Sequence, residues 1–557
     1  PYPPLTPPPR LGVGGAEGVR EASRPPRRGH AGPPLALSVR PPRSTALARR
    51  WRAAMASDLL SLPLKQTASA QLEQGLLLFI STSYSHEQAE QHRPAVGEVH
   101  ALRERVRAIA LSEATAEDAV SALGRYAKLL TSMSSRFGTA VDDALSGTDA
   151  QLELTWRDAH KPEARCTMHQ LGFERVCALY NLAAALSFRA TTRNTADGDG
   201  LRAACQDFQQ AAGALDTAAG AIAGASWASD RALTADISAA ALEGKRALML
   251  AQAQRCFYER ATRDQMKGGV VAKLAAATSA FYDEAAAKLR TVRDECVASG
   301  GGGELSPPGR ERGGGMLGKA KDRVGRASSG TGAPATLLAL ICQAEAGARI
   351  FDAWAQFHMA AEHEEKHEYG PQVARLQRAV ELATHASERL AAGGVAANSG
   401  GGAAAGASAV PPAVLKALEE AVSTIRAAEA TASKYNMNVY HERVPPISTL
   451  ASPAPKAIVK PMTPTPLALP AASNDYSDAA SAAEGDPFSR LVPLTVLTDA
   501  SVYTASLDDL LRQMSDDLND IQQTKEAELA SMDLPGTLCV RVESVESLAL
   551  ETRDRKS

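Results

Sequence analysis

Apolar residues recur with the period of an α-helix over most of this chain, and no other feature constrains its fold as strongly. The stretch 58–298 carries the pattern clearly, for example at Val176, Leu179, Tyr180, Leu182 and Leu186. Such residues line one face of a helix, and that face must be covered by a neighbour. The pattern therefore predicts successive helices that pack on one another. It resumes in three later stretches, at 336–392, 412–440 and 500–532.

The composition also favours helices. Hydrophobic residues make up 45% of the chain but aromatic residues only 4%, and alanine is abundant. This balance is typical of packed helices and is sufficient for a sizeable core. No unit of 20–50 residues repeats, so a simple tandem-repeat solenoid is not indicated. We therefore expect an all-α fold.

The first 57 residues differ from the rest in composition. They hold ten arginines and twelve prolines, but only two acidic residues, Glu17 and Glu21. Because they lack a helical period, we expect a disordered leader. An organellar transit peptide is an alternative. Another is that translation begins at Met55 and the preceding residues are upstream sequence.

Low-complexity tracts divide the remainder. Gly-rich and Ser-rich passages predict insertions at 299–335 and 393–409, and a Pro-rich and Ala-rich linker is expected at 466–486. These tracts lack the strand, turn and helix context of a phosphate-binding loop. The Arg-rich leader and the basic stretch 310–326 do not interleave aromatics with their charges, so we expect no nucleic-acid binding.

The cysteines and the hydropathy indicate a cytosolic protein. Seven cysteines are scattered without a C-x-x-C pair, which suggests a reducing compartment rather than a disulfide framework or a zinc ribbon. No run of about 18 apolar residues occurs without a charge, so no membrane span is predicted. Any membrane contact is expected to be peripheral.

A series of motifs carries a more specific signal. LGFERVCALYNLAAALS at 171–187 resembles the buried helix of the BRO1 family, which begins with a Phe-Glu-Arg triplet. Further matches follow in the family's order at LKQT (64–67), RYAKLL (125–130), LTWRDA (154–159), GLRAACQDFQQAAGAL (200–215), MLAQAQRCFYERATRDQMKGGVVAKL (249–274), VARLQRAVEL (373–382) and VYHERVP (439–445). The resemblance implies a BRO1 domain over 58–465: a curved helical stack with a tetratricopeptide-like core and a small β element near LTWRDA.

The C-terminal region is similar to the start of a second domain. PFSRLVPLTV at 487–496 and ELASMDLPGTL at 528–538 resemble the beginning of the helical V domain of Alix-type proteins. We therefore expect a partial V-like region at 487–557. In that family the V domain binds Tyr-Pro-x-Leu peptides through helices that have no match here, so such cargo is expected only if a full V domain exists.

The resemblance also implies a partner-binding surface. In the family, a hydrophobic patch receives the C-terminal amphipathic helix of an ESCRT-III filament subunit. The matching residues here are Phe257, Val270, Leu274 and Ile458, with Arg202 at a position that is often lysine. Val270 and Leu274 are four residues apart and share one face of a helix. Spacing alone is more typical of a core pair, and only the resemblance favours an exposed patch.

Tyr440 matches a position that is phosphorylated in some relatives, which makes it a candidate regulatory residue. The structural alternative is a tyrosine packed beneath the closing turn of the domain.

His363, Glu364 and His367 fit the H-E-x-x-H pattern of zinc metallohydrolases. However, Val373 occupies the place of the third metzincin ligand, and the segment is charged like a solvated helix face. We expect no metal and no cofactor. Cys342 and Arg349 are separated by six residues rather than the five of a phosphatase loop, so tyrosine-phosphatase chemistry is not indicated either.

The sequence thus predicts a non-enzymatic adaptor that binds an ESCRT-III subunit and supports cargo sorting into multivesicular bodies. It would be cytoplasmic and peripheral on endosomes. Two alternatives remain: a BRO1 scaffold in pH or Rho signalling and, more remotely, an H-E-x-x-H zinc metallohydrolase.

Overall fold

The computed structural model describes residues 59–137, 152–225, 227–230, 233–300, 334–398, 412–468 and 486–532. The leader expected at 1–57 lies outside these residues, as do 533–557 and most of the two expected insertions and the linker. Two helices nevertheless continue into the expected insertions. One runs to Gly300 and the other to Asn398, six residues past position 392.

The first part of the fold is an array of helices in which each packs on the next: α2 on α3, α3 on α4, α4 on α6, and α6 on α7. Local signals set several helix starts, because the side chains of Ser85 and Asp197 accept hydrogen bonds from the first turns of α3 and α7. The bounds are α2 Leu72–Ser83, α3 His86–Arg107, α4 Ala116–Phe137, α6 Leu171–Thr192, α7 Gly198–Ala223 and the short α8 Trp227–Asp230.

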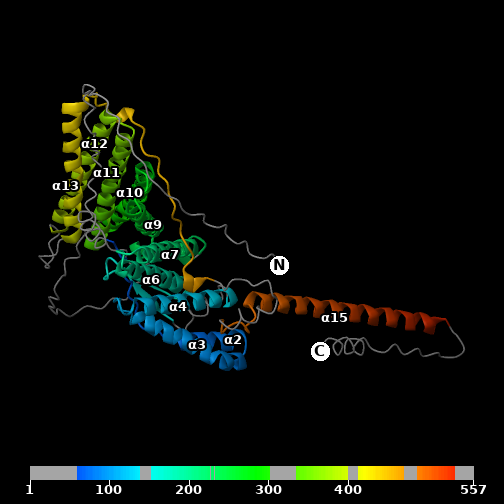
Figure 1. Ribbon diagram of the computed structural model, residues 1–557. Coiled ribbons are helices and arrows are strands. Elements are labelled where there is room, and N and C mark those ends of the chain that lie inside the picture. Colours follow the sequence, from blue (N-terminus) through cyan, green and yellow to red (C-terminus); the bar gives the residue numbers. More distant parts are fainter. Residues whose placement is uncertain are drawn as a thin grey trace, which may run out of the picture. The chain divides into compact units, whose positions relative to one another are not determined.

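The array continues with longer helices. α7 packs on α9, and the helices from α9 to α13 pack pairwise in chain order. Figure 1 shows α10, α11, α12 and α13 side by side. The bounds are α9 Ala239–Arg263, α10 Gly268–Gly300, α11 Ala335–Glu365, α12 Tyr369–Asn398 and α13 Pro412–Tyr435, with short helical turns η1 Ala235–Ile237, η2 Asn436–Tyr440, η3 Ile447–Thr449 and η4 Thr465–Leu467.

A two-stranded antiparallel sheet interrupts the helices between α4 and α6. Strand β1, Leu154–Arg157, pairs with β2, Arg165–Met168. Its position confirms the small β element expected near LTWRDA. Among the described residues the other regular elements are helical, which confirms the all-α class.

Helix α6 forms the centre of this core. All five apolar residues that defined its period in the sequence are buried, and so are most of the remaining positions. Glu174 of its Phe-Glu-Arg triplet is fully buried. Its carboxylate accepts hydrogen bonds from Arg103 Nε at 3.1 Å, Tyr126 Oη at 2.8 Å and Trp156 Nε1 at 2.6 Å. A buried charge with this many donors joins α3, α4, β1 and α6.

After α13 the chain leaves the helical array and returns across it in an extended conformation. We call residues 451–468 the crossing segment. It runs from α12, where Arg375 Nη2 donates to Ala451 O, past α10, α9 and α7 to α4, which η4 contacts. Segments far apart in sequence are joined in this way.

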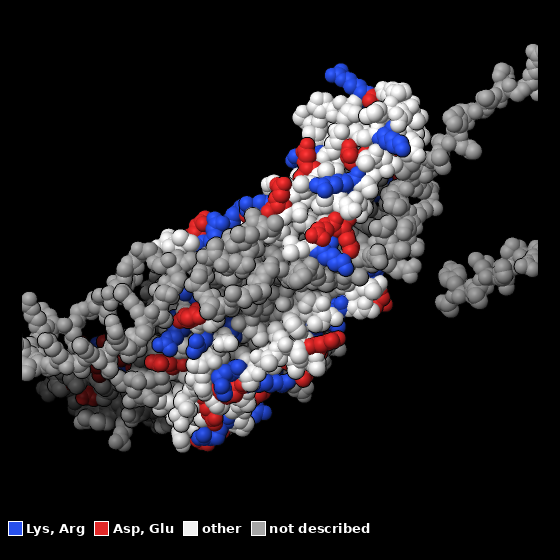
Figure 2. Space-filling view, turned by 90° about the vertical axis from the view of Figure 1, so that its left-hand side faces the viewer, with Lys and Arg blue, Asp and Glu red and all other residues white. Residues whose placement is uncertain are grey.

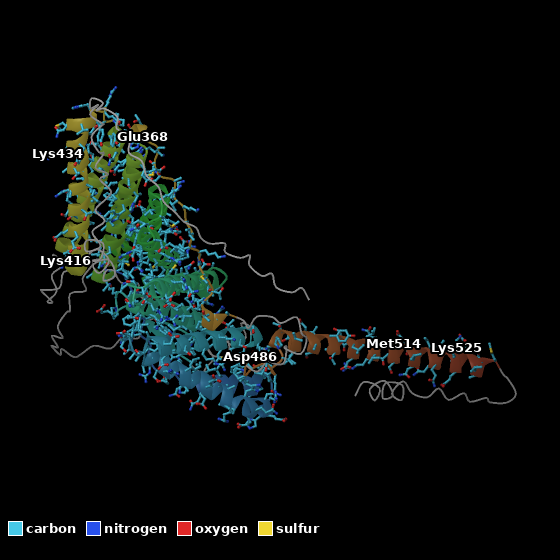
Figure 3. The ribbon with its side chains drawn as sticks, viewed as in Figure 1. Glu368, Lys416, Lys434, Asp486, Met514 and Lys525 are labelled. Carbon is cyan, nitrogen blue, oxygen red and sulfur yellow. The ribbon has the colours of Figure 1, made fainter. Side chains whose placement is uncertain are left out.

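The final described stretch begins on the helical array and then leaves it. Phe488 and Leu491 are buried, and the Phe488 ring lies near those of His92 and Phe137. Arg136 pairs with Asp486 at 2.5 Å. Helix α15, Leu494–Ser531, then has no buried residue at all. Its side chains, Met514 and Lys525 among them, project freely in Figure 3.

Candidate functional site

Phe257 lies near the C-terminal end of α9. Ser238 caps α9 by accepting a hydrogen bond from the backbone of Ala241. Phe257 is partly buried and packs against the hydrophobic core, while a portion of the side chain faces outward. This is the exposure expected of a residue at the base of a shallow apolar patch.

Val270 and Leu274 lie one turn apart on α10, but their side chains differ in burial. Val270 is half-buried. Leu274 is only 3% exposed and belongs to the hydrophobic core, next to Val271. The expectation that both present an exposed face is therefore wrong for Leu274, because α10 turns that position inward against its neighbours. An aspartate there would put an unpaired carboxylate in the core and disturb the fold itself.

The crossing segment brings Ile458 to the same region. Gln254 on α9 holds this part of the segment: its Oε1 accepts from Ile458 N at 3.0 Å, and its Nε2 donates to Lys456 O at 3.0 Å. Lys456 N in turn donates to Lys273 O on α10 at 3.1 Å. Ile458 is 47% exposed. The consecutive helices α9 and α10 and the distant crossing segment thus bring Phe257, Val270 and Ile458 into one neighbourhood, which we call the apolar patch.

Further buried amides anchor the crossing segment on α7. Gln209 Oε1 accepts from Lys460 N at 3.2 Å, and Gln210 Oε1 accepts from Thr465 N at 2.7 Å. Such bonds satisfy both the buried glutamines and the backbone of a segment that has no sheet partner. The sequence analysis assigned no role to Gln209, Gln210 or Gln254. The available signal was their occurrence in helices that are otherwise apolar.

Gly213 explains how closely the segment approaches α7. A Cβ at this position would lie 1.9 Å from Met462 O, which is not sterically tolerable. Gly220, on the same helix, has open space around it. The absence of a side chain at Gly213 is therefore required by the crossing segment.

Arg202 is at the edge of this region. Helices α7 and α9 run antiparallel, since Cys205 contacts Ala253 and Thr195 contacts Arg263. The first turn of α7 therefore lies beside the last turns of α9, where Phe257 is found. Arg202 is 60% exposed and pairs with Asp199 at 3.2 Å.

Charges of both signs surround the apolar patch. Lys273, Lys456 and Lys460 are all exposed, and together with Arg202 we call them the cationic rim. Acidic groups lie among them, because Arg202 pairs with Asp199 and the carboxylate of Glu362 lies beside Gly269. Charges also mix over the face that Figure 2 presents, where lysine and arginine are interspersed with aspartate and glutamate. The arrangement can orient an acidic or amphipathic partner through the rim and bury its apolar side chains on the patch.

Tyr440 packs within the closing turn. Its ring stacks on Tyr369 with centroids 3.5 Å apart and an angle of 7° between planes. A hydrogen bond with Tyr440 raises the pKa of Tyr369 to about 12. Tyr440 remains half-buried rather than enclosed. The stacking is the structural role considered for this residue, and its modification stays a prediction.

The H-E-x-x-H segment does not form the arrangement that its spacing suggests. Helix α11 ends at Glu365, and His367 adopts a left-handed conformation with φ of 61°. The two imidazoles therefore do not share a helical face. His363 Nδ1 lies 2.6 Å from Glu368 Oε2, in the turn before α12 where Figure 3 labels Glu368. Within the described ranges no group of three metal-ligating side chains is found.

The environment of Cys342 disfavours the thiolate that a nucleophilic cysteine needs. It lies inside α11, half-buried. Burial and the carboxylate of Glu345 raise its pKa, whereas nucleophilic cysteines depend on a lowered pKa. Arg349 is engaged with Asp283 at 3.7 Å.

A buried charged cluster holds the LKQT motif in place, and the sequence did not reveal it. Lys65 Nζ contacts Asp236 Oδ2 at 2.6 Å, and Lys245 Nζ donates to Asp236 O at 2.7 Å. Burial lowers the pKa of Lys245 to about 8. The lysine charges are balanced by Asp236 and Asp158, and the cluster is enclosed, so we assign it to stability.

Comparison with known proteins identifies related chains. The family model of the BRO1-like domain matches residues 59–511. "ALG-2 interacting protein X" of Dictyostelium discoideum is 25% identical over 480 residues, covering 86% of this chain and 50% of the relative. "Programmed cell death 6-interacting protein" of Homo sapiens is 25% identical over 86% of this chain and 46% of its own length. "Vacuolar-sorting protein BRO1" of Arabidopsis thaliana is 25% identical over 86% and 48%.

Solved structures agree in fold. The crystal structure of ALIX in complex with the SIVmac239 PYKEVTEDL late domain matches 86% of this chain and 57% of that one, with a TM-score of 0.61 and 24% identity. The ALIX BRO1 CHMP4C complex matches 72% of this chain and 95% of that one, with a TM-score of 0.53 and 24% identity. The chain spans about half the length of the curated relatives described above. Among the described residues, none of the helices is long and apolar enough to cross a membrane.

Proposed function

This chain belongs to the BRO1 family, and on that premise we propose that it is a non-enzymatic adaptor whose helical body binds the C-terminal amphipathic helix of an ESCRT-III filament subunit. We further propose that it acts in the cytoplasm, peripherally on endosomes, where it supports cargo sorting into multivesicular bodies.

One observation carries the proposal. The ALIX BRO1 CHMP4C complex is a solved structure with the same fold, and this chain covers 95% of the matched chain of that complex. The relatives named as vacuolar-sorting proteins, from Arabidopsis thaliana and Neurospora crassa, support the cellular setting. One relative, from Mus musculus, is named a tyrosine-protein phosphatase, but this chain covers only 23% of it. The environment of Cys342 gives no support to that chemistry.

Binding would follow from burial of apolar side chains. An amphipathic helix laid on the apolar patch would cover Val270, Ile458 and the outer part of Phe257. Burial of apolar surface contributes about 25 cal/mol per Å², offset by the loss of translational and rotational freedom. The cationic rim would set the orientation and raise the rate of encounter. Leu274 would support the patch from beneath instead of contacting the partner.

The crossing segment makes the patch a composite site. Ile458 reaches it only because Gln254 and Lys273 hold the backbone of the segment on α9 and α10. The partner helix would therefore bind a surface that exists only after the chain has returned across its own helices. Short fragments that end before residue 451 would lack part of the site.

The test is binding of the full chain to a fluorescent synthetic peptide from the C-terminal helix of CHMP4C, measured by anisotropy. We expect Ile458→Asp and Val270→Asp each to weaken binding about tenfold or more, because either places a charge in an apolar contact. Both positions are at least partly exposed, so the folded state should persist. Circular dichroism and thermal unfolding check this.

Met437→Asp is the matched control, since Met437 is 72% exposed and lies outside the apolar patch. It should bind the peptide as the unmodified chain does. Absence of binding by the folded, unmodified chain would refute the proposed partner. Equal binding by the unmodified chain and all three variants would instead show that the peptide does not bind at the apolar patch.

A further inference from the structure

A cavity of about 330 Å³ lies between α10, α11 and α12, the helices that stand side by side in Figure 1. The stretch 447–453, which follows the closing turn, covers one side of it. Its volume is at the lower end of the range for small-molecule sites, about 300–1,000 Å³. Most of the lining is polar, with two arginines, a glutamine, three serines and one aspartate. The cavity therefore has the size and the polarity of a site for a small polar ligand.

Arg375 is the most deeply placed charge of this lining. It is only 2% exposed. Nη1 donates to Gln356 Oε1 at 2.8 Å and Nη2 to Ala451 O at 2.5 Å, so both hydrogen bonds go to neutral groups. Nε is buried without a hydrogen-bond partner among the described residues. A buried cation with an unused donor is costly, and an anion that accepts from this donor reduces the cost.

A second arginine lines the cavity one turn further along α12. The side chain of Arg378 is 42% exposed and lies 3.0 Å from the carboxylate of Glu381, which is 66% exposed. Ion pairs as exposed as this one contribute little free energy in water. Little is therefore lost when the guanidinium of Arg378 turns from Glu381 to a ligand in the cavity.

Asp352, the carboxyl group of the lining, does not neutralise both arginines. Burial raises its pKa, and a hydrogen bond from Gln356 and the charge of Arg378 oppose only part of this rise. Gln356 also accepts from Arg375, so its amide stands between the carboxyl group and that guanidinium. Two guanidinium groups against one carboxyl group leave the lining with a positive charge even when Asp352 is ionised.

Hydroxyl groups add donors from a different part of the chain. Ser448 and Ser452 are exposed and line the cavity on the side that the stretch 447–453 covers. Donors thus come both from α12 and from this stretch. The oxygens of a phosphate group point in several directions and can accept from both sources, whereas the two oxygens of a carboxylate lie in one plane with a single guanidinium.

We propose that this cavity binds a phosphate group, carried either by free inorganic phosphate or by a small phosphate monoester. The phosphate oxygens would accept from Arg375 Nε, from the guanidinium of Arg378 and from the hydroxyls of Ser448 and Ser452. Charge-assisted hydrogen bonds of this kind are the strong ones. The site goes beyond the proposed helix binding and is separate from the apolar patch. Ser279 of the lining lies nine residues after Val270 on α10, about 14 Å along the helix and half a turn around it.

The experiment is isothermal titration calorimetry of the full chain with sodium phosphate, at an ionic strength held constant with sodium chloride. Glycerol 3-phosphate is the second ligand and acetate the third. Arg378→Ala removes a proposed donor, and Asp352→Asn removes the competing charge while keeping an acceptor for Gln356. Arg426→Ala, which removes an exposed arginine of α13 outside the lining, is the control. Circular dichroism and thermal unfolding verify that each variant is folded.

We expect phosphate to bind with a dissociation constant of about 1 mM or lower. Arg378→Ala should weaken binding about three- to tenfold, because a charge-assisted hydrogen bond is lost. Asp352→Asn should strengthen it about two- to fivefold, because a like charge is removed. Arg426→Ala should bind as the unmodified chain does. Opposite changes from two lining residues are a result that a merely structural role for them would not produce.

The ligands distinguish the two sources of phosphate. Equal affinity for phosphate and glycerol 3-phosphate would identify the free anion, and tighter binding of the ester would identify a phosphorylated small molecule. Acetate binding as tight as that of phosphate would overturn the assignment to phosphate.

Two further outcomes would overturn the site itself. One is a folded, unmodified chain that shows no saturable binding of either phosphate ligand. The other is equal phosphate binding by the unmodified chain, Arg378→Ala and Asp352→Asn. Neither outcome bears on the CHMP4C peptide, because Arg378 and Asp352 are not part of the apolar patch.

Discussion

Helices α6 and α15 are both long and both carry apolar residues at helical spacing, yet their environments are opposite. In α6, which spans 22 residues, nearly every apolar side chain is buried. In α15, which spans 38 residues, none is. Tyr503, Leu510, Met514 and Ile521 of α15 are each more than half exposed.

The difference lies in neighbours and in charge. α6 is covered by α4 and α7, and the run 176–188 contains no charged residue. α15 contacts the helical array only near its start and carries eight acidic and two basic residues over 494–531. An apolar period shows that a helix has a face to bury. It does not show that a partner is present within the same chain.

The sharpest test of this contrast is a matched pair of truncations. Leu179→Ala in α6 removes a side chain that is 1% exposed, and should lower the free energy of unfolding by about 2–5 kcal/mol through lost burial and a cavity. Leu510→Ala in α15, where the side chain is 52% exposed, should change it by no more than about 0.5 kcal/mol. Chemical denaturation measures both. A large loss from Leu510→Ala would mean that α15 is covered in solution.

The crossing segment is neither enclosed like α6 nor exposed like α15. It is extended, and the buried side-chain amides of α7 and α9 hold its backbone by hydrogen bonds. Gly213→Ala would force a Cβ against Met462 O, and should cost about 1–3 kcal/mol or displace the segment. Gly220→Ala on the same helix has free space and should stabilise the protein by about 0.5–1 kcal/mol. Thermal unfolding gives the sign of each change. CHMP4C peptide binding should be weakened by Gly213→Ala but not by Gly220→Ala, because Ile458 is part of the crossing segment that Gly213→Ala would displace.

The connection between β1 and β2 carries a buried histidine, whereas α15 has none. Burial, with the nearby Lys245 charge, lowers the pKa of His160 to about 3. Between pH 6.5 and about 3 the unfolded chain therefore binds a proton that the folded chain does not, and stability falls as the pH falls. The slope from this residue is at most about 1.4 kcal/mol per pH unit. Urea unfolding across this window should show a shallower slope for His160→Gln. An unchanged slope would assign the acid sensitivity to other groups.

Motif order identified the fold without coordinates. The Phe-Glu-Arg helix was predicted to be buried and is buried, and the short β element lies where LTWRDA predicts it. Helix boundaries were less accurate. The last helix begins at Leu494 instead of 500, and α12 runs six residues past 392. Alanine and glycine tracts are ambiguous because alanine favours helix while glycine opposes it.

The partner-binding role of Phe257, Val270, Leu274, Ile458 and Arg202 stays a prediction. Val270, Ile458 and Phe257 come from three elements that meet, but Leu274 faces the core. The i, i+4 rule placed Val270 and Leu274 on one face without indicating how that face is turned. The orientation depends on the packing of α10 against α9, which no local pattern records.

By itself the sequence determined that this chain is helical and that α6 is buried, because a long uncharged run with helical spacing has no stable alternative in water. Only the tertiary structure decided which apolar faces are covered, that Gly213 must lack a side chain, and that the buried Nε of Arg375 finds no hydrogen-bond partner among the described residues. Those features arise where residues from different helices and from the crossing segment meet, and contacts of that kind depend on the whole arrangement of the helices.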